Sequence, residues 1–496
     1  MLHVAFALSP LLVVALGACL LMMAEAFSNV KAGLAIGTAI TFAAGLSFSA
    51  AVWWMGPANL EGLDVLAPWL VVDRFTVFFD AVLCLGGVLA SLLAGGYLPE
   101  HKLDRGEFYS LLLFATFGAM MLAGSGDLLT VFLGLETMSI GAYAMTAFRR
   151  ASPRSAEGAL KYFLLGSFAA AILLYGFALL YGATGHTDLA GIGAAVKAGG
   201  RSPMIVIALV LVLVGLLFKV SAVPFHMWTP DAYEGAPTPG TTYMAIVVKA
   251  GGFAMMLRVL LTCFGDAGSM SWSAGWPPAV AWVAVLTMTV ANLIAGRQES
   301  VKRMLAYSSI AHAGYILVAL VATMRSPQQA TASVLFYLVT YTVSTAGAFG
   351  CLILCGSRGK EAVSYEDLAG IGRRHPAAAL AFGLFLFSLA GVPPTAGFFG
   401  KWFIFRAAME SGLYWLTLIA FVNSVIGAYY YLRVLVYMYM REPAAGAPVA
   451  VPMRSGYVTA ALLVSALLVI ALGISPNKSL DVAIEAAKVF AAGAGT

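Results

Sequence analysis

The stretch Phe218–Lys249 reads FKVSAVPFHMWTPDAYEGAPTPGTTYMAIVVK, and it decides how the chain must fold. An apolar segment, 203–223, carries Lys219 near its end and then meets Pro224. A second apolar segment carries Lys249 about ten residues in, roughly 15 Å along a helix. A lysine in hydrocarbon costs on the order of 3 kcal/mol, and membrane helices are interrupted only where protein or a water-filled cavity surrounds the break. The stretch therefore predicts a buried, hydrated path for ions or protons.

The composition of the whole chain is that of a polytopic membrane protein. Of its 496 residues, 61% are hydrophobic and only 10% are charged, and the mean hydropathy is +0.91. No soluble fold has this balance. The net charge of +5 does not indicate a nucleic-acid partner, because the basic residues are spread over short loops. The five cysteines lie in apolar segments and form no metal, haem or iron–sulfur pattern, so we interpret them as packing residues.

Fourteen apolar segments are long enough to span a bilayer, and they predict an all-α membrane protein with one continuous domain. Ala24-Glu25-Ala26 resembles a signal-peptidase site, but the first apolar run is long and no lysine or arginine precedes it, so we interpret it as a spanning helix. The predicted spans are 4–24, 31–54, 75–97, 107–124, 127–148, 156–183, 203–223, 240–264, 278–296, 303–324, 329–356, 377–410, 413–440 and 456–474.

The basic residues of the loops predict the orientation of the chain. Alternate loops hold fifteen Lys and Arg residues, including Lys31 and Arg358, whereas the opposite loops and the tail hold six, including Arg201. An excess of Lys and Arg marks the cytoplasmic loops of a membrane protein. Because an even number of spans places both termini on one side, this excess predicts that both termini face outward. The tail 477–490 is mildly amphipathic and is predicted to lie at the outer surface.

Two of the apolar segments are interrupted by proline in a similar way. One break is AVP at 222–224, and the other is GVPP at 391–394. Lys219 precedes the first break, and Lys401 follows the second. Paired interrupted helices in the two halves of a chain are typical of duplicated repeats whose functional site lies at the breaks.

Several ionisable residues fall inside the predicted spans. Glu136, Lys249 and Lys401 lie away from the segment ends, and an ionisable residue at that depth is a functional-site hypothesis by default. Lys219 lies only five residues before Pro224, so it could instead reach the membrane surface. If it stays buried, Glu136 and Lys219 would compensate each other as a charge pair.

Two further residues leave two interpretations open. Lys161 either joins the polar path or extends to the cytoplasmic surface. His312, with Ser308 and Ser309 one turn away, either joins a polar line or is a satisfied core histidine. Lysine suits a proton relay because it can release its proton, whereas arginine stays protonated. No nucleophile–base pair or pair of carboxylates indicates covalent or hydrolytic catalysis. Three arginines nearer to segment ends are interpreted as anchors: Arg258, Arg406 and Arg433.

Four segments resemble the antiporter-like subunits of respiratory complex I. They are LGLETMSIGAYAM around Glu136, FKVSAVPFHMWTPDAYEGAPTP around Lys219, VKRMLAYSSIAHAGY around His312 and GVPPTAGFFGKWF around Lys401. The resemblance covers essentially the whole chain. The GLETMSIGAY form, and the lysine at 401 where subunit M has a glutamate, distinguish the chain from the sister subunits L and M. Because Mrp-type cation/proton antiporters share the two proline motifs, a subunit of a Na⁺/H⁺ antiporter complex is the alternative. The buried charges argue against a third interpretation, a structural spacer.

The resemblance implies two inverted five-helix repeats, about 107–264 and 278–440, with discontinuous helices seven and twelve. It implies that this chain holds no redox cofactor, since NADH, flavin mononucleotide, iron–sulfur clusters and quinone are bound by other subunits. The implied partners are subunit M, the small subunit K and the long lateral helix of subunit L, in a bacterial inner membrane. The residues that the resemblance assigns to the proton path are Glu136, Lys219, Lys249 and Lys401, with Lys161 and His312 at further polar positions.

Overall fold

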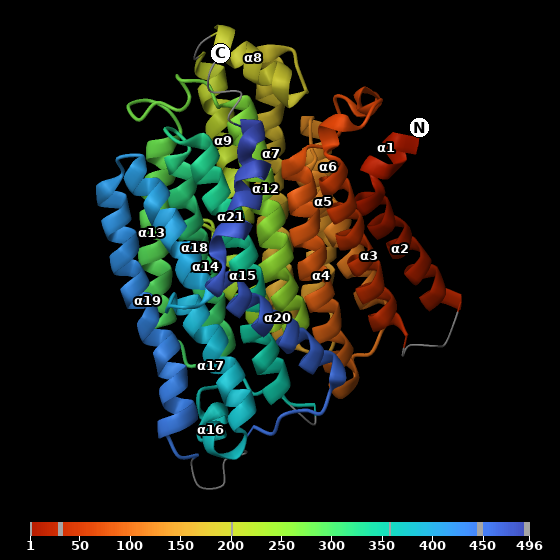
Figure 1. Cartoon of the computed structure of the whole chain (residues 1–496), viewed down its shortest axis with the longest axis vertical. Helices are drawn as coiled ribbons and strands as arrows, with labels where there is room; N and C mark the ends of the chain where they lie inside the picture. The colour runs from red at the N-terminus through yellow and green to blue at the C-terminus, as the bar shows by residue number, and fades with distance from the viewer. Residues whose placement is uncertain (1, 28–32, 200–201, 357–358, 444–449, 491–496) are drawn as a thin grey trace.

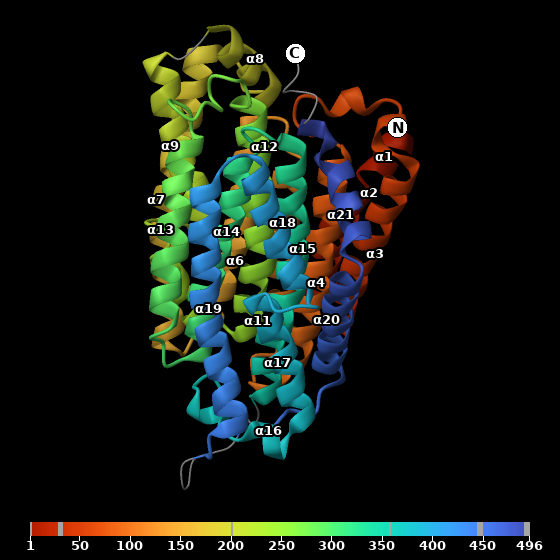
Figure 2. The same cartoon turned by 60° about the vertical axis from the view of Figure 1, so that its left-hand side comes forward.

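The computed structural model describes residues 2–27, 33–199, 202–356, 359–443 and 450–490. These residues fold almost entirely into helices, most of which run side by side in one bundle (Figure 1 and Figure 2). Across the described ranges, pairing between extended segments is limited to three isolated bridges. The predicted all-α class is therefore confirmed. Lys31, Arg201 and Arg358, which the loop-charge argument used, lie outside the described residues.

Eleven helices among the described residues are long and apolar enough to cross a membrane. Ten of them are single helices: α2 (Ser9–Phe27), α3 (Leu34–Met55), α4 (Arg74–Glu100), α6 (Leu128–Thr146), α7 (Pro153–Thr184), α13 (Pro277–Ala295), α14 (Val301–Ala322), α15 (Pro327–Cys355), α19 (Tyr414–Met440) and α20 (Gly456–Ile474). The eleventh is a composite of three consecutive elements: α11 (Thr238–Tyr243), the π-helical turn η3 (Met244–Val248) and α12 (Lys249–Cys263).

The remaining helices are shorter. The α-helices among them are α1 (Leu2–Ala7), α5 (Glu107–Ala123), α8 (Leu189–Gly199), α9 (Pro203–Lys219), α10 (Trp228–Gly235), α16 (Ile371–Arg374), α17 (Pro376–Ala390), α18 (Ala396–Glu410) and α21 (Pro476–Ala487). Short 3₁₀ turns are η1 (Pro57–Asn59), η2 (Leu63–Leu66), η4 (Glu366–Leu368) and η5 (Lys488–Phe490).

Polar side chains begin several of these helices. Asp73 caps α4, Asp127 caps α6 and Ser300 caps α14, each by accepting a hydrogen bond from an N–H of the first turn. Ser152 and Ser202 do the same for α7 and α9, each directly before a proline at the first helical position. Because these N–H groups have no partner within the helix, a cap stabilises its start by about 1 kcal/mol.

Both predicted helix interruptions are present. Helix α9 ends at Lys219, and helical structure resumes with α10 at Trp228. Helix α17 ends at Ala390, and α18 begins at Ala396. Gly391 ends α17 with φ +87°, a left-handed conformation in which any side chain would be strained. The two breaks therefore lie next to Lys219 and within reach of Lys401.

Three elements form the interior of the bundle. The composite α11–η3–α12, α14 and α15 bury nearly all of their residues. They carry Lys249 on α12 and His312 on α14, so the structure holds these two side chains near the centre. Peripheral helices instead expose large apolar side chains, as on α7, where Phe168 is exposed, and on α13, where Trp282 is exposed. Such an apolar exterior suits contact with lipid.

The tail differs from its prediction. Instead of lying apart on an outer surface, α21 packs along α15 and against α4, and it continues upward from α20 along the side of the bundle (Figure 1). Arg74 at the start of α4 pairs with Glu485 of α21 at 2.5 Å. The physical reason is the small size of the inner face of α21, which lets the helix approach closely. That face consists of Ala483, Ala486 and Ala487, all fully buried.

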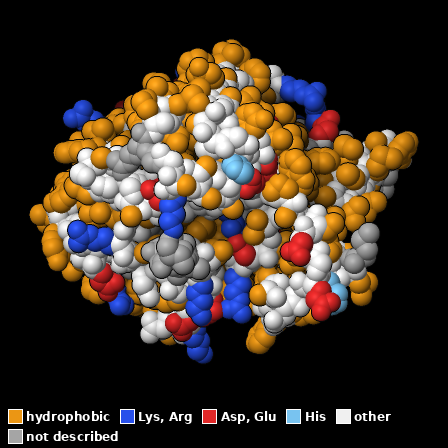
Figure 3. Space-filling model, turned by 90° about the horizontal axis from the view of Figure 1, so that it is seen from above, with side chains coloured by type: hydrophobic (Ala, Val, Ile, Leu, Met, Phe, Trp, Pro, Cys, Tyr) orange, Lys and Arg blue, Asp and Glu red, His pale blue; other side chains and the backbone are white. Residues whose placement is uncertain are grey.

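Helix α1 and the end of α21 lie at the same end of the bundle as α8 (Figure 2). Figure 3 views the molecule from this end and shows charged side chains of both signs scattered among apolar ones. The opposite end carries α16 and the ends of α4 and α19 (Figure 1). These two ends of the bundle are called the α8 end and the α16 end.

Candidate functional site

Lys219 is buried and contacts α6. Its side chain is 4% exposed, and its Nζ donates a hydrogen bond to Ser139 Oγ at 2.8 Å. The aromatic ring of Tyr162 lies 5.8 Å from the same nitrogen. The alkyl chain packs against Gly252 of α12, where an added Cβ would lie 3.3 Å from Lys219 Cγ. The alternative in which Lys219 reaches the membrane surface is therefore wrong, because the break after α9 turns its side chain inward.

Glu136 lies three residues before Ser139 on α6. Its Oε1 is buried without a hydrogen-bond partner among the described residues. A cavity of about 10 Å³ lies between Glu136, Ser139, Tyr143 and Lys219, which is room for about one water molecule. The ion pairs that the structure describes do not include one between Glu136 and Lys219. The two charges therefore interact across this cavity rather than by direct contact.

Lys249 is the first residue of α12, directly after the π-helical turn η3. It is 2% exposed, and its Nζ donates to the carbonyl oxygen of Ser309 at 2.5 Å and also to Ser309 Oγ. Tyr341 of α15 donates to the same hydroxyl at 2.8 Å, and its ring lies 5.6 Å from the Lys249 nitrogen. A π-helical turn within an α-helix frequently marks a functional site, and here it directly precedes the buried lysine.

His312 is bonded through both ring nitrogens. Its Nδ1 lies 2.5 Å from the hydroxyl of Tyr337, and its Nε2 lies 2.9 Å from the hydroxyl of Tyr431. Tyr431 also bonds Ser308. Both interpretations of His312 thus hold: it is a satisfied buried histidine, and it belongs to a polar line that includes Ser308. A cavity of about 10 Å³ beside His312 leaves room for about one water molecule.

Lys401 reaches back across the second helix break. Its Nζ donates to the carbonyl oxygen of Ala390, the last residue of α17, at 2.8 Å, and to Ser424 Oγ at 2.9 Å. A helix end leaves carbonyl groups without partners, and Lys401 satisfies one of them. The ring of Tyr315 lies 5.2 Å from the same nitrogen. Tyr315 is on α14, the helix that also carries His312.

These contacts form a polar axis across the middle of the bundle. Lys219 packs against α12, and Lys249 of α12 donates a hydrogen bond to α14. Helix α14 also carries His312 and Tyr315, and the ring of Tyr315 faces Lys401. The tyrosines of this axis were not predicted, although Tyr337 and Tyr341 stand one turn apart within one predicted span. That spacing is the signal that could have found them.

Lys161 lies apart from the polar axis. Its Nζ pairs with Glu157 and with Asp231 of α10, each at 2.7 Å, and its side chain is 43% exposed. Arg303 also pairs with Asp231, at 2.8 Å. The geometry thus favours the surface interpretation of Lys161, which helps to hold α10 in place.

An ionic cluster that was not predicted surrounds Glu361. Glu361 Oε1 accepts hydrogen bonds from Tyr97 and Thr238, each at 2.5 Å, and lies 3.1 Å from Arg149 and 3.5 Å from Lys302. Burial alone would raise the pKa of Glu361, but the charges of Lys302 and Arg149 hold it at about 2. The partners lie far apart in the chain, so no local pattern predicts the cluster.

Arg258 is not an anchor at a membrane surface. It is 4% exposed, and its guanidinium bonds both carboxylate oxygens of Asp73, at 2.6 and 3.0 Å. It also donates to Thr76 at 2.9 Å and to the carbonyl of Ala123. Burial alone would raise the pKa of Asp73, but the charge and hydrogen bonds of Arg258 hold it below its usual range. The prediction failed because antiparallel packing brings the start of α4 beside α12.

The described residues contain no group of three or more His, Cys, Asp or Glu side chains that could hold a metal ion. The site is therefore built from lysines, hydroxyl groups, one histidine and one carboxylate. These groups can hold and pass protons, since each hydroxyl both donates and accepts a hydrogen bond.

Known proteins are similar to this chain in sequence and in fold. A family model described as NADH:quinone oxidoreductase/Mrp antiporter, TM matches residues 125–427. NADH-quinone oxidoreductase subunit N 1 from Sorangium cellulosum is 69% identical and covers 97% of this chain and 98% of that protein. NADH-quinone oxidoreductase subunit N from Myxococcus xanthus is 39% identical and covers 97% of each.

Solved structures are also similar. A chain of respiratory complex I from Thermus thermophilus with bound aureothin has a TM-score of 0.79 and 36% identity, covering 95% of this chain and 98% of that one. A chain of the Mrp complex from Dietzia sp. has a TM-score of 0.87 over 99% and 98% of the two chains, but only 22% identity, which shows a common fold alone. The chain described here therefore belongs to the antiporter-like family of NADH:quinone oxidoreductase and Mrp membrane subunits, in its subunit N branch.

Proposed function

We infer that this chain is a proton-translocating membrane subunit of a respiratory complex I. The observation that carries this inference is the buried polar axis, in which Lys219, Lys249 and Lys401 lie inside an apolar bundle with protein hydroxyl or carbonyl partners. Burying three ammonium groups is costly, and a spacer protein has no use for them. The high identity to a subunit N supports the same conclusion.

We propose that protons move along this axis, which joins Glu136, Lys219, Lys249 and Lys401. Each lysine ammonium has three donors, and its serine partner can accept from the charged form or donate to the neutral amine. Lys219 and Ser139, Lys249 and Ser309, and Lys401 and Ser424 are three such pairs. Cavities that hold about one water lie at the Glu136 and His312 positions, where the side chains leave gaps. Lys161 is proposed to act only as a support for α10.

The architecture proposed for this function has fourteen spans, ten of which form two inverted five-helix repeats at about 107–264 and 278–440. The eleven long helices, the short helix α5 and the two interrupted helices α9–α10 and α17–α18 make up the fourteen. Each repeat contains one interrupted helix with a buried lysine beside the break, which supports the duplication. In the proposed orientation, which the excess of basic residues in alternate loops supports, the α16 end faces the cytoplasm and both termini face the outside of a bacterial inner membrane.

We propose that the partners are subunits M and K and the lateral helix of subunit L. Electron transfer from NADH to quinone would take place in other subunits, which bind the flavin and the iron–sulfur clusters. The alternative, a subunit of an Mrp-type Na⁺/H⁺ antiporter complex, is compatible with the common fold. The identity of 69% to a subunit N, against 22% to the Mrp chain, favours the first proposal.

Inside-out membrane vesicles test this function. NADH oxidation and proton uptake are measured together for the parent and for Lys249→Ala, after the amount of assembled complex has been checked. The expected result is a lower proton yield per electron in the variant, with assembly retained. The antiporter alternative would instead be supported if the chain purified without NADH-oxidising subunits and moved protons only against Na⁺.

A further inference from the structure

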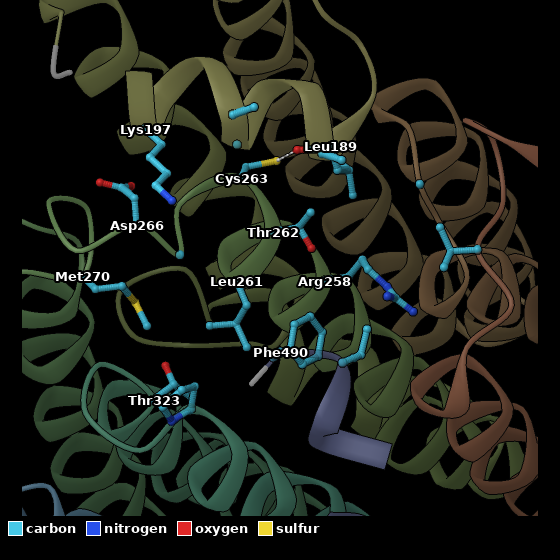
Figure 4. A pocket seen from close by; sticks show the side chains of 18 of the residues that line it. Leu189, Lys197, Arg258, Leu261, Thr262, Cys263, Asp266, Met270, Thr323 and Phe490 are labelled. Atoms are coloured by element: carbon cyan, nitrogen blue, oxygen red, sulfur yellow. Dashed lines mark hydrogen bonds between the residues drawn. The ribbon is translucent and has the colours of Figure 1, made fainter. Parts of the chain in front are cut away.

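A large cavity opens at the α8 end of the bundle. Its volume is about 710 Å³, and it lies between α8, the end of α12 and the tail. Figure 4 shows Lys197 and Asp266 on one side of this cavity and Arg258 on the other, with Phe490 at the end of the tail. Because the lining includes charged and hydroxyl groups, the cavity can hold water. In the proposed orientation it is open toward the outside of the membrane.

The ion pair between Arg258 and Asp73 lies beside this cavity. Both residues line it, and both carboxylate oxygens of Asp73 bond the guanidinium. Arginine does not release its proton at working pH, so this pair cannot pass a proton as Lys249 could. A proton that leaves the polar axis at this end needs another acceptor on the inner side of the pair.

Asp80 lies at the required place. It is on α4, seven residues after Asp73 and four after Thr76, and these spacings put the three side chains on one face. Asp80 is 5% exposed, and its Oδ1 has no hydrogen-bond partner within the described part of the chain. A buried ionisable side chain without a partner at membrane depth is a functional-site hypothesis by default.

The antiparallel packing of α4 and α12 fixes the depth of Asp80. Thr76 bonds Arg258 near the cavity, and an added Cβ at Gly86 would lie 2.8 Å from Val247 at the other contact. Between these two contacts, Asp80 is level with residues 253–254 of α12. That is about one turn beyond Lys249 toward the cavity, or roughly 7 Å of helical rise. In depth along the bundle, Asp80 therefore lies between Lys249 and the ion pair.

We propose that Asp80 is a further proton-carrying residue, which takes protons from the Lys249 part of the polar axis and delivers them to the cavity at the α8 end. This inference rests on the proposed function. The lysine ammonium becomes a neutral amine as the Asp80 carboxylate becomes a carboxylic acid. The acid then releases the proton to water of the cavity and returns to the carboxylate.

The test measures proton yield per electron in inside-out vesicles for the intact complex. Asp80→Asn removes the acid with little change of shape, Asp80→Glu keeps an acid, and Lys249→Ala is the reference. Ser91→Ala is the matched control, because Ser91 is fully buried on α4 and bonds only a nearby carbonyl of its own helix. We expect Asp80→Asn to lower the yield to the value of Lys249→Ala, the double variant to go no lower, and Asp80→Glu and Ser91→Ala to keep the parental yield.

The outcomes separate the two proposals. If Lys249→Ala loses yield while assembled Asp80→Asn keeps the parental value, the role of Asp80 is overturned and the proposed function stands. If Lys249→Ala itself keeps the parental yield, the proposed function fails. Should Asp80→Asn not assemble, Asp80→Leu, of similar volume, takes its place. If neither carboxyl-free variant assembles while Asp80→Glu and Ser91→Ala do, Asp80 is a structural residue and the inference is wrong.

Discussion

Lys219 donates a hydrogen bond to Ser139 at 2.8 Å, although the carboxylate of Glu136 lies one turn earlier on the same helix. The lysine is thus held by a neutral hydroxyl, and its charge is balanced only across a cavity of about 10 Å³. A direct buried ion pair would be hard to separate once formed. A separation bridged by about one water leaves Lys219 able to change its protonation state without breaking a direct contact to Glu136.

The first prediction concerns the coupling between these two residues. Glu136→Gln and Lys219→Ala should each depress quinone reduction and proton uptake strongly, since each leaves the other charge without its opposite charge. The double variant should lose less than the sum of the single losses, as interacting neighbours do. Both activities are measured in vesicles for the parent and the three variants.

The control for this cycle is Thr137→Val. Thr137 neighbours Glu136 on α6, but its hydroxyl bonds the carbonyl of Leu133 in its own helix, so its loss should leave both activities unchanged. Simple additivity of the two charge removals would count against coupling across the cavity.

The second prediction separates proton carriers from fixed charges. Lys249→Arg and Lys401→Arg keep the positive charge but cannot release a proton at working pH. Both variants should assemble and should move fewer protons per electron than the parent. Lys360→Arg, at an exposed position in a loop, is the control and should behave as the parent. The measurement is the proton-to-electron ratio, normalised to the amount of assembled complex.

Arginine is bulkier than lysine, so assembly is checked first. Parental ratios in both arginine variants would show that the charge, and not the exchange of protons, is what the site requires.

The third prediction concerns the second helix break. An added Cβ at Gly397 would lie 1.8 Å from the backbone oxygen of Ser388, so Gly397→Ala must push α18 away from α17. Overpacking of this kind typically costs about 1–3 kcal/mol, and it also moves Lys401 from its carbonyl partner. We expect lower thermal stability of the purified complex and weaker pumping. Gly456→Ala, where an added Cβ meets nothing within 4 Å, should change neither. Equal melting temperatures for the two variants would refute this account of the break.

The fourth prediction is a pH dependence of stability at Glu361. Because folding lowers the pKa of Glu361 from an ordinary value of 4.5 to about 2, its stabilising effect is fully present above about pH 4.5 and is lost as the pH falls toward 2. This shift corresponds to an effect on the order of 3 kcal/mol. Glu361→Gln should therefore melt at a lower temperature than the parent at pH 7, and the difference should narrow below about pH 4.5.

Glu366→Gln is the control for this comparison, since Glu366 is exposed nearby in η4. It should melt with the parent at every pH. A gap between Glu361→Gln and the parent that stays constant from pH 7 down to pH 3 would mean that the glutamine acts by its shape and not by its missing charge.

The sequence by itself determined the class of the fold and the residues around which function is proposed. Spans are readable because hydrocarbon demands about twenty consecutive apolar residues. The breaks beside Lys219 and before Lys401 are readable because proline cannot continue a helix. Lysine in an apolar run is conspicuous because it is costly there. All three signals are local, so they survive without knowledge of the neighbouring helices.

Only the tertiary structure decided which side chains meet. Lys219 bonds Ser139 and not Glu136, and Arg258 pairs with Asp73. Glu361 pairs with Arg149 and Lys302, which come from distant segments of the chain. These contacts depend on the register and crossing of helices that lie far apart in the chain, and periodicity within one helix does not specify them. The position of the tail was also decided by tertiary packing, since the alanines of α21 allow it to pack on α15. Close approach between two helices depends on both surfaces and not on the amphipathic pattern of one.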